Sequence, residues 1–171
     1  DLSSCLRQVM FLMRIGNPHI NFTDHLPAQP IKAVFDRRLM SQALTNVMKN
    51  ATEGILALPE SERPTPKIDV NIIVTENDLI SIDIIDNGKG FPAENRQRLL
   101  EPYMTTRDEG TGLGLPSDAK IFEDHGGGIE LLDAPEGRGA RVHLFFPRQA
   151  HETKVAAQDY RPARDPLNQN R

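Results

Sequence analysis

Three short segments of this 171-residue chain carry residue types that bind cations and phosphates in proteins. The first is an amide, Asn50, on a predicted helix. The second, Asp86-Asn87-Gly88-Lys89-Gly90, closes a predicted strand, and the third, Gly110-Thr111-Gly112-Leu113-Gly114-Leu115, opens another helix. Short glycine motifs recur by chance, so the prediction rests on the order and spacing of all three.

The amide of Asn50 could bind a hard cation such as Mg²⁺, which takes oxygen ligands and often keeps several waters. Its helix is expected to begin after an N-cap at Asp36 and to run to about Leu58, before Pro59. Asn46 lies one turn earlier on the same face and could hold a metal-bound water or a phosphate. Taken alone, these residues fit a solvated polar face better, and the two later segments reverse that preference.

Asp86 is expected to be buried, because it follows an apolar strand. A buried carboxylate must find hydrogen-bond donors, and the amino group of adenine is such a donor. Gly88 and Gly90 would allow a turn with positive φ and let a flat base approach the backbone. An ordinary Asp-Asn-Gly turn is the alternative. A predicted helix follows, rather than a return strand, which argues against a simple hairpin.

The glycine-rich segment precedes a helix predicted over residues 115–124, so its free N–H groups and the helix dipole would attract a phosphate. Hydroxyl and guanidinium donors lie just upstream, at Thr105, Thr106 and Arg107. A flexible surface loop with a helix cap is the alternative, and a loop of this length also suits a mobile lid. Together the three segments predict a pocket for ATP and a divalent cation.

The remaining pattern predicts the elements that hold these segments. Apolar spacing favours a helix over 2–14 and a short helix over 92–100. Alternation favours strands, which are expected at 68–75, 79–86, 129–133 and 140–146, with short extended pieces at 19–22 and 31–35. Helices on one face of a mixed, mostly antiparallel sheet make a two-layer α/β sandwich. Neither a Rossmann nor a P-loop fingerprint follows a first strand.

Bulk composition narrows the class further. Hydrophobic residues make up 38% and charged residues 26%, as in a globular domain. The net charge of −4 gives no support for a nucleic-acid partner. No apolar run reaches the roughly 20 residues that cross a bilayer. The chain does not begin with Met, so we expect a piece of a longer protein. From residue 148 the apolar content falls, which predicts a disordered tail over 148–171.

These segments resemble the conserved boxes of the ATP-binding domain of sensor histidine kinases, within the group that includes DNA gyrase, MutL and the ninety-kilodalton heat-shock chaperones. Residues 46–51 resemble the N box, 86–90 the G1 box, 100–107 the F box and 110–114 the G2 box. The match covers about residues 31–147. The sequences of residues 11–14 and 101–107 further resemble those of the NtrY-like nitrogen-response kinases.

The resemblance implies a Bergerat-type ATP-binding fold, with ATP and Mg²⁺ as ligands. Asn50 would bind Mg²⁺, with Asn46 and Asn50 as the catalytic pair, and Asp86 would bind the adenine amino group. Residues 104–113 would form the lid. The residues that the resemblance assigns to nucleotide binding are Lys49, Asn50, Asp86, Gly88, Gly90, Tyr103, Thr105, Thr106, Arg107, Gly110, Thr111, Gly112, Leu113, Gly114 and Leu115.

The resemblance also implies a domain order and partners. Residues 1–18 would end a preceding dimerisation and phosphoacceptor region or a linker, and 19–147 would be the kinase domain. None of the five histidines stands beside an acidic residue on a helical hairpin, so the acceptor histidine would lie on such a hairpin outside this chain. The fragment would bind ATP as a monomer in the cytoplasm without phosphorylating itself. The full protein would be an inner-membrane homodimer that passes the phosphoryl group to a response regulator.

Three alternatives stay open. Gyrase-like and chaperone-like relatives place a water-activating carboxylate where this chain has Asn46, so ATP hydrolysis is disfavoured. A non-catalytic nucleotide-binding or docking module is the second alternative, because Pro116-Ser117-Asp118 replaces the usual apolar start of the lid helix. A serine kinase acting on an anti-sigma partner would use the same pocket. Tyr103 in place of Phe and Ala140 in place of Thr or Ser are further departures from the family pattern.

Overall fold

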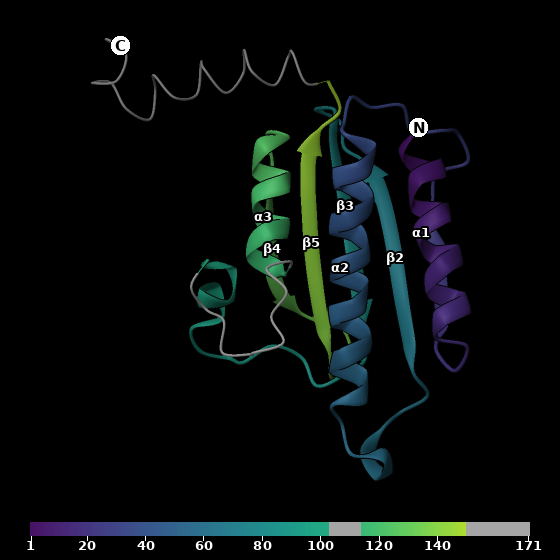
Figure 1. The fold of residues 1–171 in the computed structure, drawn as a ribbon, viewed down its shortest axis with the longest axis vertical. Helices are drawn as coiled ribbons and strands as arrows, with labels where there is room; N and C mark the ends of the chain where they lie inside the picture. Colours follow the sequence, from purple (N-terminus) through teal and green to yellow (C-terminus); the bar gives the residue numbers. More distant parts are fainter. Residues whose placement is uncertain (103–113, 150–171) are drawn as a thin grey trace.

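A computed structural model of the chain describes residues 1–102 and 114–149. It has two layers, with three helices on one face of a five-stranded sheet (Figure 1). The helices are α1 (Leu2–Gly16), α2 (Arg37–Leu56) and α3 (Leu115–Asp124), and short 3₁₀ segments span Glu60–Glu62 and Arg96–Leu100. The strands are β1 (Asn21–His25), β2 (Lys67–Val74), β3 (Leu79–Asp86), β4 (Gly128–Asp133) and β5 (Ala140–Pro147). The predicted two-layer α/β sandwich is confirmed.

The sheet has the strand order β1-β2-β3-β5-β4. β1 runs parallel to β2, and the other neighbouring pairs are antiparallel. Inward-facing residues alternate along β2, β3 and β5, and the register places Ile82 of β3 beside both Ile72 of β2 and Leu144 of β5. β3 is therefore the central strand, and its last residue, Asp86, lies within the sheet rather than at an edge.

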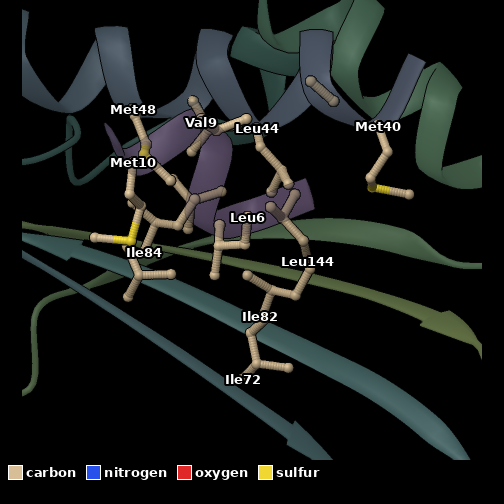
Figure 2. Close-up of a cluster of buried hydrophobic side chains, with 14 of the residues drawn as sticks. Leu6, Val9, Met10, Met40, Leu44, Met48, Ile72, Ile82, Ile84 and Leu144 are labelled. Carbon is tan, nitrogen blue, oxygen red and sulfur yellow. The ribbon is translucent and has the colours of Figure 1, made fainter. Parts of the chain in front are cut away.

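The core fills the space between the helices and the sheet. Figure 2 shows side chains from α1, α2 and three strands meeting in one cluster. Leu6 and Met10 of α1 are fully buried there, as are Leu44 and Met48 of α2. Each such side chain contributes roughly 1.5–3 kcal/mol on leaving water. α1 therefore belongs to the same core as the strands, and whether it also ends a preceding helical region stays a prediction.

Caps fix the ends of α2 and α3 relative to each other. The Asp36 side chain accepts a hydrogen bond from Leu39 N at 2.9 Å, so the predicted N-cap is present. The same residue's backbone N–H donates to Nε2 of His125 at 3.0 Å, while Nδ1 of that ring lies 2.8 Å from the carbonyl of Ile121. His125 thus joins the end of α3 to the start of α2, which is a structural role for this histidine.

Three local expectations differ from the structure. Residues 31–35 form no strand, because the segment makes isolated bonds to Leu2 and Arg148 instead of pairing with the sheet. The helix expected over 92–100 is reduced to the 3₁₀ segment, which follows a left-handed Asn95 (φ 58°). α2 ends at Leu56, one half-turn before the expected Leu58.

The folded region extends past the expected domain end at residue 147. Arg148 pairs with both carboxylate oxygens of Asp78, through Nε at 3.0 Å and a terminal nitrogen at 3.3 Å. The rest of the predicted tail, beyond Gln149, lies outside the described residues. Over 1–102 and 114–149, none of the helices combines the length and apolar content that a bilayer crossing requires.

Candidate functional site

One stripe of α2 connects the predicted boxes. Asn46, Asn50 and Gly54 are spaced four residues apart, so they lie one above another on a single helix face. α2 itself is fixed by the apolar residues of its opposite face, which are buried against the sheet and α1. One end of the stripe contacts the loop after β3, and the other contacts the first turn of α3.

At Gly54, α2 meets the loop that follows β3. Lys89 N donates to the carbonyl of Gly54 at 3.0 Å. A Cβ on Gly88 would lie 2.5 Å from the carbonyl carbon of Gly54, so only glycine allows the two backbones to approach this closely. Gly90 has φ of +81°, which glycine adopts without strain. These contacts hold the predicted adenine-binding loop against the last turns of α2.

Asp86 is buried at the end of β3, with 6% of its surface exposed. Its Oδ1 accepts from Gly88 N at 2.7 Å and from Ala140 N at 3.4 Å. Within the described residues, Oδ2 accepts no hydrogen bond and is left for a further donor. Burial raises the pKa of this carboxyl above its ordinary value, and the two N–H donors oppose that effect.

At the other end of the stripe, Asn46 meets the first turn of α3. Its Nδ2 donates to Oδ1 of Asp118 at 3.1 Å. Asp118 has no exposed surface, and its Oδ2 has no hydrogen-bond partner among residues 1–102 and 114–149. Burial raises the pKa of Asp118 to about 7, although the Asn46 amide opposes the shift. The helix that follows the glycine-rich segment is thus attached to α2 through a buried polar contact.

Asn50 lies between these two contacts. It is one turn from Gly54, which touches the loop after β3, and one turn from Asn46, which touches α3. Its side chain is half-buried, and no hydrogen bond to it is described within residues 1–102 and 114–149. Figure 1 shows α2 between α3 and α1, in front of β3. The amide oxygen of Asn50 is therefore available to a ligand that spans the two ends of the stripe.

The predicted site residues fall into three groups. Asn46, Asn50, Asp86, Gly88 and Gly90 are brought together around the α2 stripe, with Gly114 and Leu115 at the start of α3. Lys49 is exposed on α2, and its predicted contact with phosphate stays a prediction. The remaining predicted residues lie outside the described part of the chain; they are Tyr103, Thr105, Thr106, Arg107, Gly110, Thr111, Gly112 and Leu113.

Sequence reasoning missed three residues of this arrangement. Gly54 could have been found as the next position of the Asn46–Asn50 stripe. Gly139 has φ of +135° and lies against the backbone of Asp86, where a Cβ would overlap the carbonyl oxygen. Asp118 occupies the buried face of its helix, three residues after Leu115, so an acidic residue at an apolar position was the available clue.

A hollow of about 460 Å³ lies beside the loop after β3, and Asp86 is not among the residues that line it. Asn87 lines it, and the Asn87 side chain bonds Lys67 N and the carbonyl of Thr65, whereas Asp86 faces Gly88 and Ala140. Glu62 and Arg138, 3.8 Å apart, line the same hollow. It is separate from the α2 stripe.

Comparison with known proteins supports the class that this geometry suggests. Residues 35–150 match the model of the histidine kinase-, DNA gyrase B- and HSP90-like ATPases. The nitrogen regulation protein NtrY of Azorhizobium caulinodans is 57% identical over 145 residues, which are 84% of this chain and 18% of that protein.

Solved structures show the same fold. The catalytic domain of histidine kinase ThkA superposes with a TM-score of 0.74 at 25% identity, covering 88% of this chain and 95% of that one. ThkA in complex with the response regulator protein TrrA gives a TM-score of 0.70 at 22% identity, covering 89% of this chain and 42% of that one, a likeness of fold alone.

The chain belongs to the family of histidine kinase-, DNA gyrase B- and HSP90-like ATPases. Within that family it is the ATP-binding catalytic domain of a sensor histidine kinase, and it is similar to NtrY. The chain spans less than a fifth of the length of that relative. The family expected from the four boxes is thereby confirmed.

The buried carboxyl of Asp118 predicts a pH-dependent stability. Because its pKa is raised to about 7 in the folded protein, the folded state binds a proton that the unfolded chain releases near pH 4. The free energy of unfolding should therefore fall as the pH rises from about 4 through 7, and Asp118→Asn should reduce that fall. Urea unfolding at several pH values measures it, with the exposed Asp124→Asn as control. Equal slopes for Asp118→Asn and the unmodified chain would contradict this prediction.

Proposed function

We propose that this domain binds Mg²⁺–ATP along the α2 stripe and catalyses transfer of the γ-phosphoryl group of ATP to a histidine. That histidine would lie on a helical hairpin outside this chain. One observation carries the proposal: a single helix face contacts the loop after Asp86 at Gly54 and the start of α3 at Asn46. Between them lies Asn50, whose amide has no hydrogen-bond partner among the described residues. A nucleotide placed with its base near Asp86 and its phosphates near α3 would pass Asn50.

The base end of this site fits adenine. Oδ1 of Asp86 is already bound by two backbone N–H groups, which orient the carboxylate. Oδ2 can then accept from the exocyclic amino group of the base, a charge-assisted hydrogen bond. Gly88 and Gly139 keep side chains out of the backbone that surrounds the carboxylate. A guanine base would present a carbonyl oxygen at that position and leave the carboxylate without its donor.

The phosphate end fits a magnesium ion. The donor set on α2 is made of neutral amide oxygens, and Mg²⁺ is commonly held by one or two protein oxygens together with phosphates and waters. Asn50 is the residue that would hold the ion. Bound there, Mg²⁺ would neutralise phosphate charge, while α3 directs its N-terminal N–H groups toward an anion. The lid residues that the family resemblance assigns would complete this end.

Transfer to a partner is favoured over hydrolysis. A hydrolase needs a base that can reach the attacking water, and Asn46 is an amide without useful basicity. Among the described residues, Asp118 is the one carboxylate that is hydrogen-bonded to the stripe, through Asn46. It is fully buried, so it is not exposed to an attacking water. An imidazole nucleophile needs no such base from this domain. His125 is hydrogen-bonded to the carbonyl of Ile121, and His143 is hydrogen-bonded to Asp83. Neither histidine lies on the α2 stripe.

The acceptor and downstream partner then follow from the class. A helical hairpin of the longer protein would carry the acceptor histidine and would form the homodimer, and a response regulator would receive the phosphoryl group. Support for the regulator comes from the recorded complex of ThkA with TrrA. The longer protein would place this domain in the cytoplasm and be anchored in the inner membrane.

Replacing Asp86 with Asn should weaken ATP binding tenfold or more, on the order of 1.4 kcal/mol. The Asn side chain would keep one oxygen to accept from Gly88 N. Its N–H₂ group would then face the amino group of adenine, so two donors would oppose each other. Isothermal titration calorimetry with a non-hydrolysable ATP analogue and Mg²⁺ measures the change, and the exposed Asp124→Asn serves as control. An affinity equal to that of the unmodified chain would remove Asp86 from the site.

Asn50→Ala should reduce the dependence of ATP binding on Mg²⁺, because the ion would lose its protein ligand. In titrations with and without Mg²⁺, the gain in affinity from the metal should shrink, while affinity without the metal should change little. Gln42→Ala, on the same helix, is the matched control. A full metal-dependent gain in Asn50→Ala would show that the ion is held elsewhere.

A further inference from the structure

Asp118 is a buried carboxyl to which the proposed function gives no role. It lies on the first turn of α3 and has no surface exposed to solvent. One of its oxygens accepts from Asn46, and the other has no hydrogen-bond partner in the part of the chain that the structure describes. Burying a carboxyl costs free energy unless its oxygens are paired or hydrogen-bonded. A carboxyl at this position therefore lowers the stability of the fold. A role in positioning the residue that it contacts would account for its presence.

The contact fixes the orientation of the Asn46 amide. A side-chain amide has a donor and an acceptor on opposite branches, so holding Nδ2 toward Asp118 turns Oδ1 away from it. Oδ1 of Asn46 accepts no hydrogen bond within residues 1–102 and 114–149. It belongs to the stripe that carries Asn50, one helical turn away. The amide thus presents an acceptor, not a donor, along the stripe.

We propose that Asp118 is a positioning residue for the metal–phosphate end of the nucleotide site: by binding Nδ2 of Asn46, it presents the Asn46 carbonyl oxygen to a water of the bound magnesium ion. The inference rests on the proposed function. Without the carboxyl, the amide could rotate and direct its N–H₂ group at that water, where two donors would oppose each other. The effect should be confined to the metal-bearing end, because the loop that follows Asp86 contacts α2 two turns away, through Gly88 and Lys89 at Gly54.

The test compares two substitutions that differ in whether Asn46 keeps an acceptor. Asp118→Val removes both oxygens and leaves a buried apolar side chain. Asp118→Asn keeps an amide oxygen for Nδ2 of Asn46. We expect Asp118→Val to weaken Mg²⁺–ATP binding about fivefold, the effect of one net hydrogen bond, and Asp118→Asn to stay within about twofold of the unmodified chain. Adenosine, which reaches only the base end, should bind both variants as it binds the unmodified chain.

A double-mutant cycle with Asn46→Ala separates positioning from general distortion. If Asp118 acts through Asn46, Asp118→Val should have no further effect on Mg²⁺–ATP affinity in the Asn46→Ala background. Thermal unfolding should show that Asp118→Val is at least as stable as the unmodified chain, which a purely structural role of the carboxyl would not predict. Asp118→Ala gives the same deletion with a smaller side chain if valine is not accommodated.

Three results would overturn the proposal: unchanged Mg²⁺–ATP affinity in Asp118→Val, an equal loss for adenosine, or an effect that persists without Asn46. Failure of the proposed function is distinguishable from these results. In that case the unmodified chain binds neither Mg²⁺–ATP nor adenosine, and both proposals are rejected together.

Discussion

The close approach between the loop after β3 and the end of α2 is the constraint on which the site depends. Two glycines, Gly54 and Gly88, meet there backbone to backbone, and Lys89 N bonds the carbonyl of Gly54. A side chain at Gly88 would force the strand end and the helix apart. Because Asn46 and Asn50 lie on the same face of that helix, the contact also sets the position of the Asp86 loop relative to the two amides.

Two carboxyl groups are buried in this part of the molecule. Asp86 and Asp118 are both buried carboxyls whose pKa is raised by burial, but they are satisfied to different degrees. Asp86 accepts two backbone N–H groups, which offset part of its desolvation cost. Asp118 accepts one hydrogen bond from the Asn46 amide, and its second oxygen has no partner among the described residues. Each group is joined to the α2 stripe, Asp118 through Asn46 and Asp86 through the loop that follows it, so under the proposed function the cost of burying both falls beside the nucleotide.

Local pattern was enough to predict most of the fold and the places of Asp86, Asn46 and Asn50 within it. Alternation along β3 predicted that Asp86 would end a buried strand, and helical spacing placed Asn46 and Asn50 on one face. The contacts between elements could not be read from local pattern. Gly54 matters because a loop more than thirty residues away touches it, and Asp118 matters because Asn46, on another helix, bonds it.

The same limit explains the errors. Residues 31–35 have the alternation of a strand, but the neighbouring edge of the sheet is formed by β1, which pairs with β2 instead. The segment is left with single bonds to Leu2 and Arg148. Hydrophobic pattern reports which side chains are buried, whereas strand assignment also requires a partner with free backbone groups. Long-range pairing supplied that partner to β1 and not to residues 31–35.

The central claim is that the loop after β3 and the start of α3 serve a single nucleotide through one face of α2. Amide hydrogen exchange with increasing Mg²⁺–ATP tests it most directly. The account predicts that exchange slows at residues 86–90 and at residues 115–119 with the same half-saturating concentration, while exchange in β1 is unchanged. Protection at only one of the two segments, or at both with different concentrations, would contradict it.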